Sequence, residues 1–382
     1  MALSNPQDTA APPVDVAKVL SDLSEVRDAT LTLVAHLDDA TLQRTLSPIM
    51  SPLVWDLAHI AAYEDLWLAH RLAGLPLLRP DLAALYDAFE TPRAVRGEID
   101  LLDAPAARTY LRDVRERVLA ALARADIGED VLCELVLRHE LQHTETMRQT
   151  MALAGILPPG EPPPASASQK IAHESNSASG WAELPSASFA MGAPPEGFAY
   201  DNERPRHTVA LPAFAIARHP VSNASWLSFS EGGGYERREW WSDEGWAWKE
   251  EYDITHHPTV TTGDPRAAAC HISWFEADAF ARAHDARLPT EAEWERAATS
   301  NQLAGTRQVW EWTNTRFSGY PGFVAYPYRE YSEVFFDRDY LVLRGGSWAT
   351  DRRVASTTFR NWDYPQRRQI FAGVRLARAA AQ

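Results

Sequence analysis

The first 155 residues repeat apolar side chains at intervals of three and four positions, the spacing of an amphipathic helix. Four stretches share this pattern: 16–46, 52–74, 105–125 and 132–147. Helices with one apolar stripe are stable in water when the stripes pack against one another. We therefore predict a four-helix bundle over residues 15–156.

The pattern changes after residues 157–180, a proline-rich and then serine-rich stretch typical of a linker. Short runs beyond it predict strands at 188–194, 207–222 and 340–348, and helical spacing returns at 222–232, 272–285 and 290–299. Thr290 and Glu293 match the capping box that starts a helix. Residues 181–378 are therefore interpreted as an α+β domain with little regular structure and many loops.

Composition and charge exclude some classes of binding partner. The chain has 382 residues, enough for two cores, and its net charge of −15 with a pI of about 5.3 argues against nucleic acid and anionic membranes as partners. The sequence contains no apolar run long enough to span a bilayer and no signal-peptide pattern at its start. Its two cysteines suggest no disulfide framework. We expect a soluble, cytoplasmic protein.

The candidate chemistry begins with His139 and His143, which are four residues apart in the fourth predicted helix. Their rings project from one helix face, an arrangement suited to two ligands of one metal ion. A solvated helix with two incidental histidines would give the same pattern. His59 lies in the second predicted helix, where a hydrogen-bonded core histidine and a third metal ligand are both possible. The ligand role requires the two helices to pack together.

Two arginines, Arg93 and Arg96, are the cations of the loop between the second and third predicted helices. Two guanidinium groups near a metal can bind a carboxylate in a bidentate manner. Their spacing alone favours an ordinary surface pair.

Eight motifs in order resemble the ergothioneine-biosynthetic sulfoxide synthases, a family of nonheme iron enzymes. The motifs are PLVWDLAHIAAYEDLW, LRHELQHTETM, YDNERPRHTV, RLPTEAEWE, VWEWT, YREYSEVFF, VLRGGSW and FRNWDYPQRRQIFAGVRLAR. The resemblance covers roughly residues 20–378. It implies a DinB-like four-helix bundle followed by a C-type-lectin-like domain of the formylglycine-generating-enzyme type.

The resemblance assigns roles to particular residues. It implies that His59, His139 and His143 bind Fe(II), leaving coordination positions open for substrate and O2. It also implies that hercynine, a trimethylated histidine betaine, contacts three further residues, Gln142, Asn361 and Trp362. An aromatic face suits a quaternary ammonium group, which has no N–H to donate.

Further positions match the family's remaining pocket residues. Tyr328 corresponds to a tyrosine that supplies a proton or an electron during the reaction, and Tyr331 to a second pocket tyrosine. Arg93 and Arg96 correspond to residues that hold the carboxylates of γ-glutamylcysteine, and Asp363 to the partner of its amino group. The implied substrates are hercynine, a thiol or selenol donor and O2.

The chain departs from the family between TEAEWE and VWEWT, where it carries only RAATSNQLAGTRQ. Family members usually have a much longer segment there. We expect this difference to reshape the donor side of the domain, and it suits the selenoneine synthase branch of the family, whose donor is a selenosugar. A formylglycine-generating activity is not expected, because Cys270 is the only cysteine after the linker. The alternatives are a DinB-type metal-dependent thiol transferase and a noncatalytic binding module.

Overall fold

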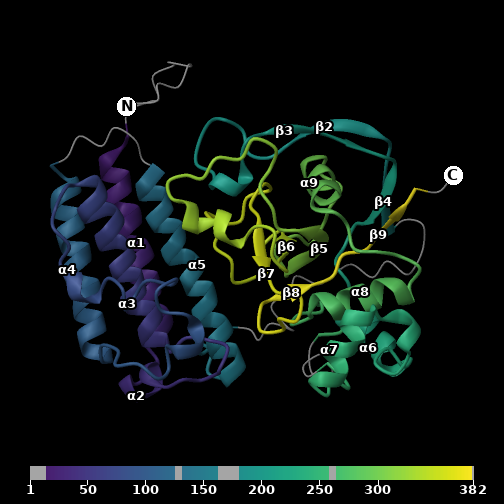
Figure 1. Ribbon diagram of the computed structural model, residues 1–382, viewed down its shortest axis with the longest axis horizontal. Helices are drawn as coiled ribbons and strands as arrows, with labels where there is room; N and C mark the ends of the chain where they lie inside the picture. Colours follow the sequence, from purple (N-terminus) through teal and green to yellow (C-terminus); the bar gives the residue numbers. More distant parts are fainter. Residues whose placement is uncertain (1–13, 125–130, 162–179, 258–263, 381–382) are drawn as a thin grey trace. The chain divides into compact units, whose positions relative to one another are not determined.

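The computed structural model describes residues 14–124, 131–161, 180–257 and 264–380 (Figure 1). The chain forms two compact units that meet in the sequence between Ala154 and Gly155. Most of the predicted linker, residues 162–179, lies outside the described residues. Within the described ranges, no helix combines the length and the apolar character needed to cross a bilayer.

The N-terminal unit is built from helices that pack side by side (Figure 1). They are α1 (Val16–Val34), α2 (Asp39–Gln43), α3 (Leu53–Glu64), α4 (Ala104–Leu122) and α5 (Val131–Ala154), with a π-helical extension of α3, η1 (Asp65–Leu72). The first predicted helix is in fact two. Helix α1 ends at Val34, and α2 begins after Asp38, whose side chain caps its N-terminus. The other three predicted helices are confirmed.

Four of the buried charged residues of the bundle, one from each long helix, form a network of ion pairs. Arg27 of α1 and Arg115 of α4 each bind both Glu64 of α3 and Glu140 of α5, with N–O distances of 2.6–2.9 Å. All four side chains are at most 6% exposed. Because each carboxylate touches two guanidinium groups, the charges are paired, and the four helices are joined next to His139.

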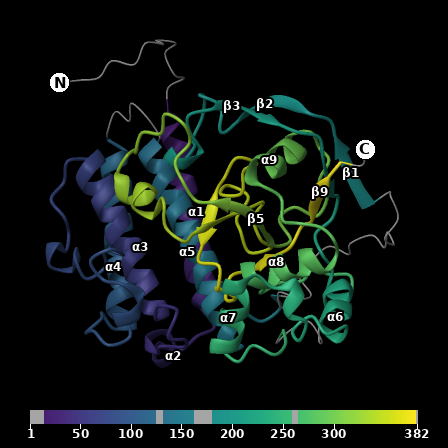
Figure 2. The same cartoon turned by 45° about the vertical axis from the view of Figure 1, so that its right-hand side comes forward.

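The C-terminal unit has three small sheets, four α-helices and several short 3₁₀ helices among its described residues (Figure 2). The sheets have the strand orders β1-β4-β9, β2-β3 and β7-β6-β5-β8. Their strands are β1 (Trp181–Leu184), β2 (Ala187–Met191), β3 (His207–Leu211), β4 (Phe214–Ala217), β5 (Trp310–Arg316), β6 (Leu341–Arg344), β7 (Asn361–Asp363), β8 (Ala372–Gly373) and β9 (Ala377–Ala379). The helices are α6 (Asn223–Glu231), α7 (Asp243–Glu251), α8 (Trp274–Ala283) and α9 (Glu291–Thr299).

Several predictions for this unit are confirmed. Strands form within all three predicted stretches, and α6, α8 and α9 occupy the three predicted helical ones. Thr290 and Glu293 make the predicted capping box at the start of α9. Helix α7 and the strands β1, β5, β7, β8 and β9 were not predicted. Four of these five strands have only two to four residues, too few for a period-two pattern to stand out.

Candidate functional site

Three histidine side chains from two helices meet inside the bundle. His59 comes from α3, and His139 and His143 come from successive turns of α5. One ring nitrogen of each lies within 4.8 Å of the others, and the Nε2 atoms of His59 and His139 are 3.1 Å apart. His59 could act as a third ligand only if its helix packs against the helix of His139 and His143. Helix α3 does pack directly on α5.

Hydrogen bonds orient two of these rings. The Nδ1 of His59 lies 2.6 Å from the carbonyl oxygen of Tyr86, which can only accept, so the proton is on Nδ1. The Nδ1 of His143 lies 2.9 Å from a carboxylate oxygen of Asp56 and donates to it. Because Nδ1 of each ring is used in these hydrogen bonds, Nε2 is the ring nitrogen that can bind a metal ion.

The environment of the cluster keeps the imidazoles of His59 and His139 neutral. His59 is 6% exposed and His139 is 9% exposed. Burial, reinforced by the nearby His143, holds the pKa of both rings well below the usual histidine value. Aromatic rings cover them: Tyr63 stacks on His139 at 3.6 Å, and Trp55 stacks on His59 at 4.6 Å.

The cluster fits a divalent transition metal. Two nitrogens about 2.1 Å from one ion and at a right angle to each other are about 3.0 Å apart. The 3.1 Å between His59 Nε2 and His139 Nε2 matches that separation. Three imidazole ligands suit iron, zinc, copper or nickel, and three ligands leave positions open for substrates.

The other predicted residues of the N-terminal unit have different surroundings. Gln142 lies half-buried on α5, next to His143 in sequence. Arg93 is exposed in the short helical turn η3 (Arg93–Val95). Arg96 is 5% exposed, and it donates to the oxygens of Thr91, Ser51 and Ala88. Its guanidinium lies 3.4 Å from the ring centroid of Trp55. Arg96 therefore supports the aromatic ring that stacks on His59.

The predicted residues of the C-terminal unit form an aromatic cluster of their own. Asn361, Trp362 and Asp363 make up β7, which pairs with β6. Trp362 stacks on Phe317 at 4.0 Å and meets the edge of Tyr331 at 6.1 Å. Tyr331 in turn meets Tyr328 at 6.2 Å. The two tyrosines and Trp362 are half-buried, so each ring is partly accessible to solvent.

The polar members of β7 have local hydrogen bonds. The side-chain oxygen of Asn361 accepts from the backbone N–H of Trp362 at 2.9 Å. Asp363 accepts from the backbone N–H of Tyr364 at 2.8 Å and from Gln369 at 3.3 Å. These bonds fix the directions of both side chains within the C-terminal unit.

Sequence reasoning missed the residues that support the site residues. Asp56 precedes His59 by one helical turn, and a carboxylate in an otherwise apolar helix is a signal that could have identified it. Tyr86 contributes a backbone carbonyl, which no sequence pattern reveals. Asp201, which binds the loop carrying the two tyrosines, belongs to the quoted YDNERP motif but received no role.

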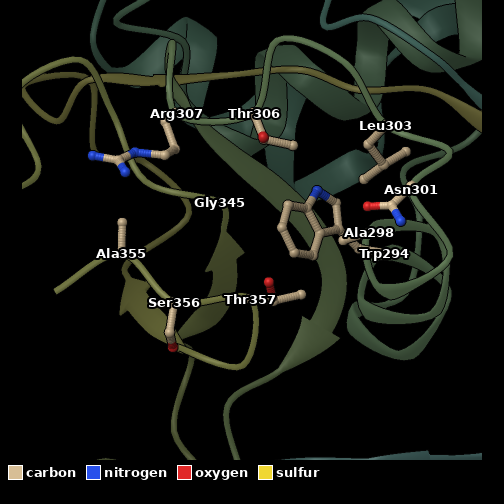
Figure 3. Close-up of a pocket in the computed structure, with 10 residues that line it drawn as sticks. All are labelled: Trp294, Ala298, Asn301, Leu303, Thr306, Arg307, Gly345, Ala355, Ser356 and Thr357. Carbon is tan, nitrogen blue, oxygen red and sulfur yellow. The ribbon is translucent and has the colours of Figure 1, made fainter. Parts of the chain in front are cut away.

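The shortened segment lines a cavity of about 260 Å³ in the C-terminal unit. Five of its residues contribute to one part of the wall: Ala298, Asn301, Leu303, Thr306 and Arg307. Figure 3 shows Thr306 and Arg307 opposite Ser356 and Thr357, with the indole of Trp294 between the two groups. The shortened segment thus lies beside the β6–β7 connection.

Comparison with protein families agrees with the two-part organisation. Residues 22–147 match the DinB superfamily. Residues 168–308 and 301–380 match the sulfatase-modifying factor enzyme 1-like domain. The predicted fold class, a DinB-like bundle followed by a formylglycine-generating-enzyme-like domain, is confirmed. The two matched stretches of the second domain overlap at residues 301–308.

Characterised relatives resemble nearly the whole chain. It is 38% identical to the hercynine oxygenase of Mycolicibacterium thermoresistibile, with 94% of each chain covered. It is also 38% identical to the hercynine oxygenase of Mycobacterium tuberculosis, covering 93% of this chain and 97% of the relative. The formylglycine-generating enzyme of Streptomyces coelicolor is 34% identical over 39% of this chain and 55% of its own length.

Proposed function

The chain belongs to the hercynine oxygenase family, the ergothioneine-type sulfoxide synthases, and from this premise we propose that it is an Fe(II)- and O2-dependent enzyme that joins sulfur or selenium to hercynine. The new bond forms at C2 of the imidazole. The C2–H bond and the S–H or Se–H bond of the donor are replaced by a C–S or C–Se bond. O2 is the oxidant that takes up the released electrons and protons.

The observation that carries this proposal is the meeting of His59, His139 and His143. We assign these three imidazoles as the iron ligands, with Tyr86 and Asp56 fixing the orientation of His59 and His143. When bound there, Fe(II) would supply a site at which hercynine and O2 react. The aromatic walls contributed by Trp55 and Tyr63 limit the access of water to the imidazoles.

Hercynine recognition is assigned to Gln142, Asn361 and Trp362. The indole offers a π face to the trimethylammonium group, and the two amides offer N–H donors to the carboxylate.

The donor is assigned to Arg93, Arg96 and Asp363, with a selenosugar as a candidate beside γ-glutamylcysteine. The exposed guanidinium of Arg93 suits a carboxylate-bearing peptide. The shortened segment and its cavity favour a donor of different shape. In a competition assay with hercynine, Fe(II) and air, mass spectrometry of the products decides between the two donors. Faster turnover with γ-glutamylcysteine would remove the selenosugar hypothesis.

Tyr328 is assigned as the group that delivers a proton during bond formation, and Tyr331 as its neighbour in the pocket. Replacing Tyr328 by Phe removes the acidic hydrogen and retains the ring. We expect Tyr328→Phe to oxidise the donor without joining it to hercynine. Unchanged product partitioning in this variant would contradict the assigned role.

A metal-dependent thiol transferase could use the same three histidines without an oxidant. An anaerobic assay separates the two functions: the proposed enzyme stops without O2, whereas a transferase continues. Metal analysis of the purified protein, compared with His59→Ala, tests in parallel whether the histidines bind the metal at all.

A further inference from the structure

The loop that carries the two tyrosines has little regular structure of its own. We call residues 326–332 the tyrosine loop; only the short turn η9 (Arg329–Tyr331) is regular. Tyr326, at the start of this loop, is 52% exposed, and the neighbouring Val324 is 76% exposed. Backbone hydrogen bonds of a sheet or a long helix do not hold this loop, so its position depends on side-chain contacts.

A buried segment of the second domain supplies those contacts. We call residues 200–202 the anchoring segment. Oδ2 of Asp201 accepts the backbone N–H of Tyr326 at 3.3 Å, and Oδ1 accepts the hydroxyl of Ser332. One carboxylate therefore binds both ends of the tyrosine loop. The side-chain amide of Asn202 donates to the same Ser332 oxygen at 2.9 Å.

The anchoring segment also contacts a tyrosine directly. The ring of Tyr200 stacks on Tyr331 at 4.5 Å with an interplanar angle of 3°. Asp201 is 5% exposed, and Tyr200, Asn202 and Ser332 are at most 2% exposed. The contacts are shielded from water, which makes each hydrogen bond stronger than it would be at the surface.

The anchoring segment is joined to β7 as well. Arg360, which precedes Asn361, donates to the carbonyl oxygen of Asn202 at 2.8 Å and forms two hydrogen bonds with Glu291. Asn202 thus contacts both the tyrosine loop and the residue that precedes β7. This arrangement fixes Tyr331 relative to Trp362, whose rings meet edge to face.

We propose that Asp201 is a positioning residue that, with Asn202 and Ser332, holds Tyr328 and Tyr331 in place for the reaction. The proposal rests on the function assigned above to those tyrosines. A phenol that delivers a proton works only within hydrogen-bond reach of its target, and small displacements reduce rates strongly. Asn cannot replace Asp201, because its NH2 group cannot accept the second of the two hydrogen bonds.

The first test measures the loop without any turnover. In Asp201→Asn, amide hydrogen exchange in peptides covering residues 324–336 should accelerate by about tenfold, the effect of losing one hydrogen bond to a charged acceptor. Ser332→Ala should accelerate the same peptides. Asp278→Asn is the matched control, since Asp278 is also a largely buried carboxylate and binds Arg282 on α8 instead. Unchanged exchange in Asp201→Asn and Ser332→Ala would overturn the anchoring role.

The second test links the anchor to the chemistry. Asp201→Asn should raise the fraction of donor oxidised without bond formation to hercynine, and the added effect should disappear in the Tyr328→Phe, Tyr331→Phe background. An equal effect in both backgrounds would show that Asp201 acts elsewhere. If the wild-type protein forms no hercynine product, the proposed function fails, whereas the exchange experiment still decides whether Asp201 anchors the loop.

Discussion

The two units place their candidate site residues by different physical means. In the bundle, helical periodicity places His139 and His143 one turn apart, and the packing of α3 on α5 brings in His59. In the C-terminal unit, individual buried side chains such as Asp201 fix the tyrosines, which lie on an irregular loop. In a helix, many backbone hydrogen bonds together hold a side chain in place. In an irregular loop, the position of a side chain depends on contacts with a few other side chains.

This difference matters for how mutations act. A substitution in the bundle that preserves packing should leave the histidine geometry intact, because neighbouring helical turns still define it. A single substitution at the anchoring segment should displace the tyrosines while the fold persists.

The largest effect is expected for His139→Ala. This change removes one of three imidazoles and should abolish iron binding and product formation, because two neutral nitrogens hold a metal weakly. Iron content by elemental analysis and product by mass spectrometry are the measurements. His36→Ala, on an exposed position of the same unit, is the control and should retain both. Full iron content in His139→Ala would contradict the ligand assignment.

A large loss of stability is expected for Arg115→Met. The variant leaves Glu64 and Glu140 buried with only Arg27 between them, which should lower the free energy of unfolding by about 3–5 kcal/mol. Arg112→Met, one turn away and 59% exposed, should cost less than about 1 kcal/mol. Urea denaturation compares the two variants. Equal losses would mean that the buried ion pairs do not join the helices as described.

An intermediate effect is expected for Asp56, which orients His143. Asp56→Ala should weaken metal binding by about 10–100-fold, the typical cost of losing such a partner. Asp56→Asn retains an acceptor oxygen for His143 Nδ1–H and should lose less. Titration with Co(II), followed by visible absorption, measures both. Unchanged affinity in Asp56→Ala would exclude this role.

The smallest effect is a pH dependence at Asp201. Burial raises the pKa of this carboxyl to about 6, above the ordinary value of 3.8. Between these values the folded state binds more protons than the unfolded state, so the contribution of this group to stability falls as pH rises from about 4 to about 6. The destabilisation caused by Asp201→Asn should therefore be larger at pH 4.5 than at pH 7.5. Denaturation curves at both values measure it, and a pH-independent difference would contradict the raised pKa.

Helical patterns in the sequence were sufficient for the bundle and for part of its site. The His139–His143 pair follows from the spacing of one amphipathic helix, and His59 becomes a third ligand candidate once the helices are assumed to pack. The break between α1 and α2 was not predicted, because the apolar spacing continues across Asp38 although that residue caps a new helix.

The loops of the C-terminal unit were less predictable for a physical reason. Irregular segments have no period, so residues such as Tyr331 and Trp362 gained a role only through resemblance to a family. The edge-to-face contact between Tyr331 and Trp362 depends on the pairing of β7 with β6 and on the ring of Phe317, which stacks on Trp362. These partners are distant from Trp362 in the sequence.

The sequence alone determined the order of the two domains, the helical bundle and the residue types capable of binding a metal, because these depend on local periodicity and side-chain chemistry. Only the tertiary structure decided that His59 comes within 3.1 Å of His139, that Asp56 and Tyr86 orient the rings, and that Asp201 binds both ends of the tyrosine loop. These contacts join residues 27 to 131 positions apart, and long-range pairing of that kind leaves no periodic signal in a single chain.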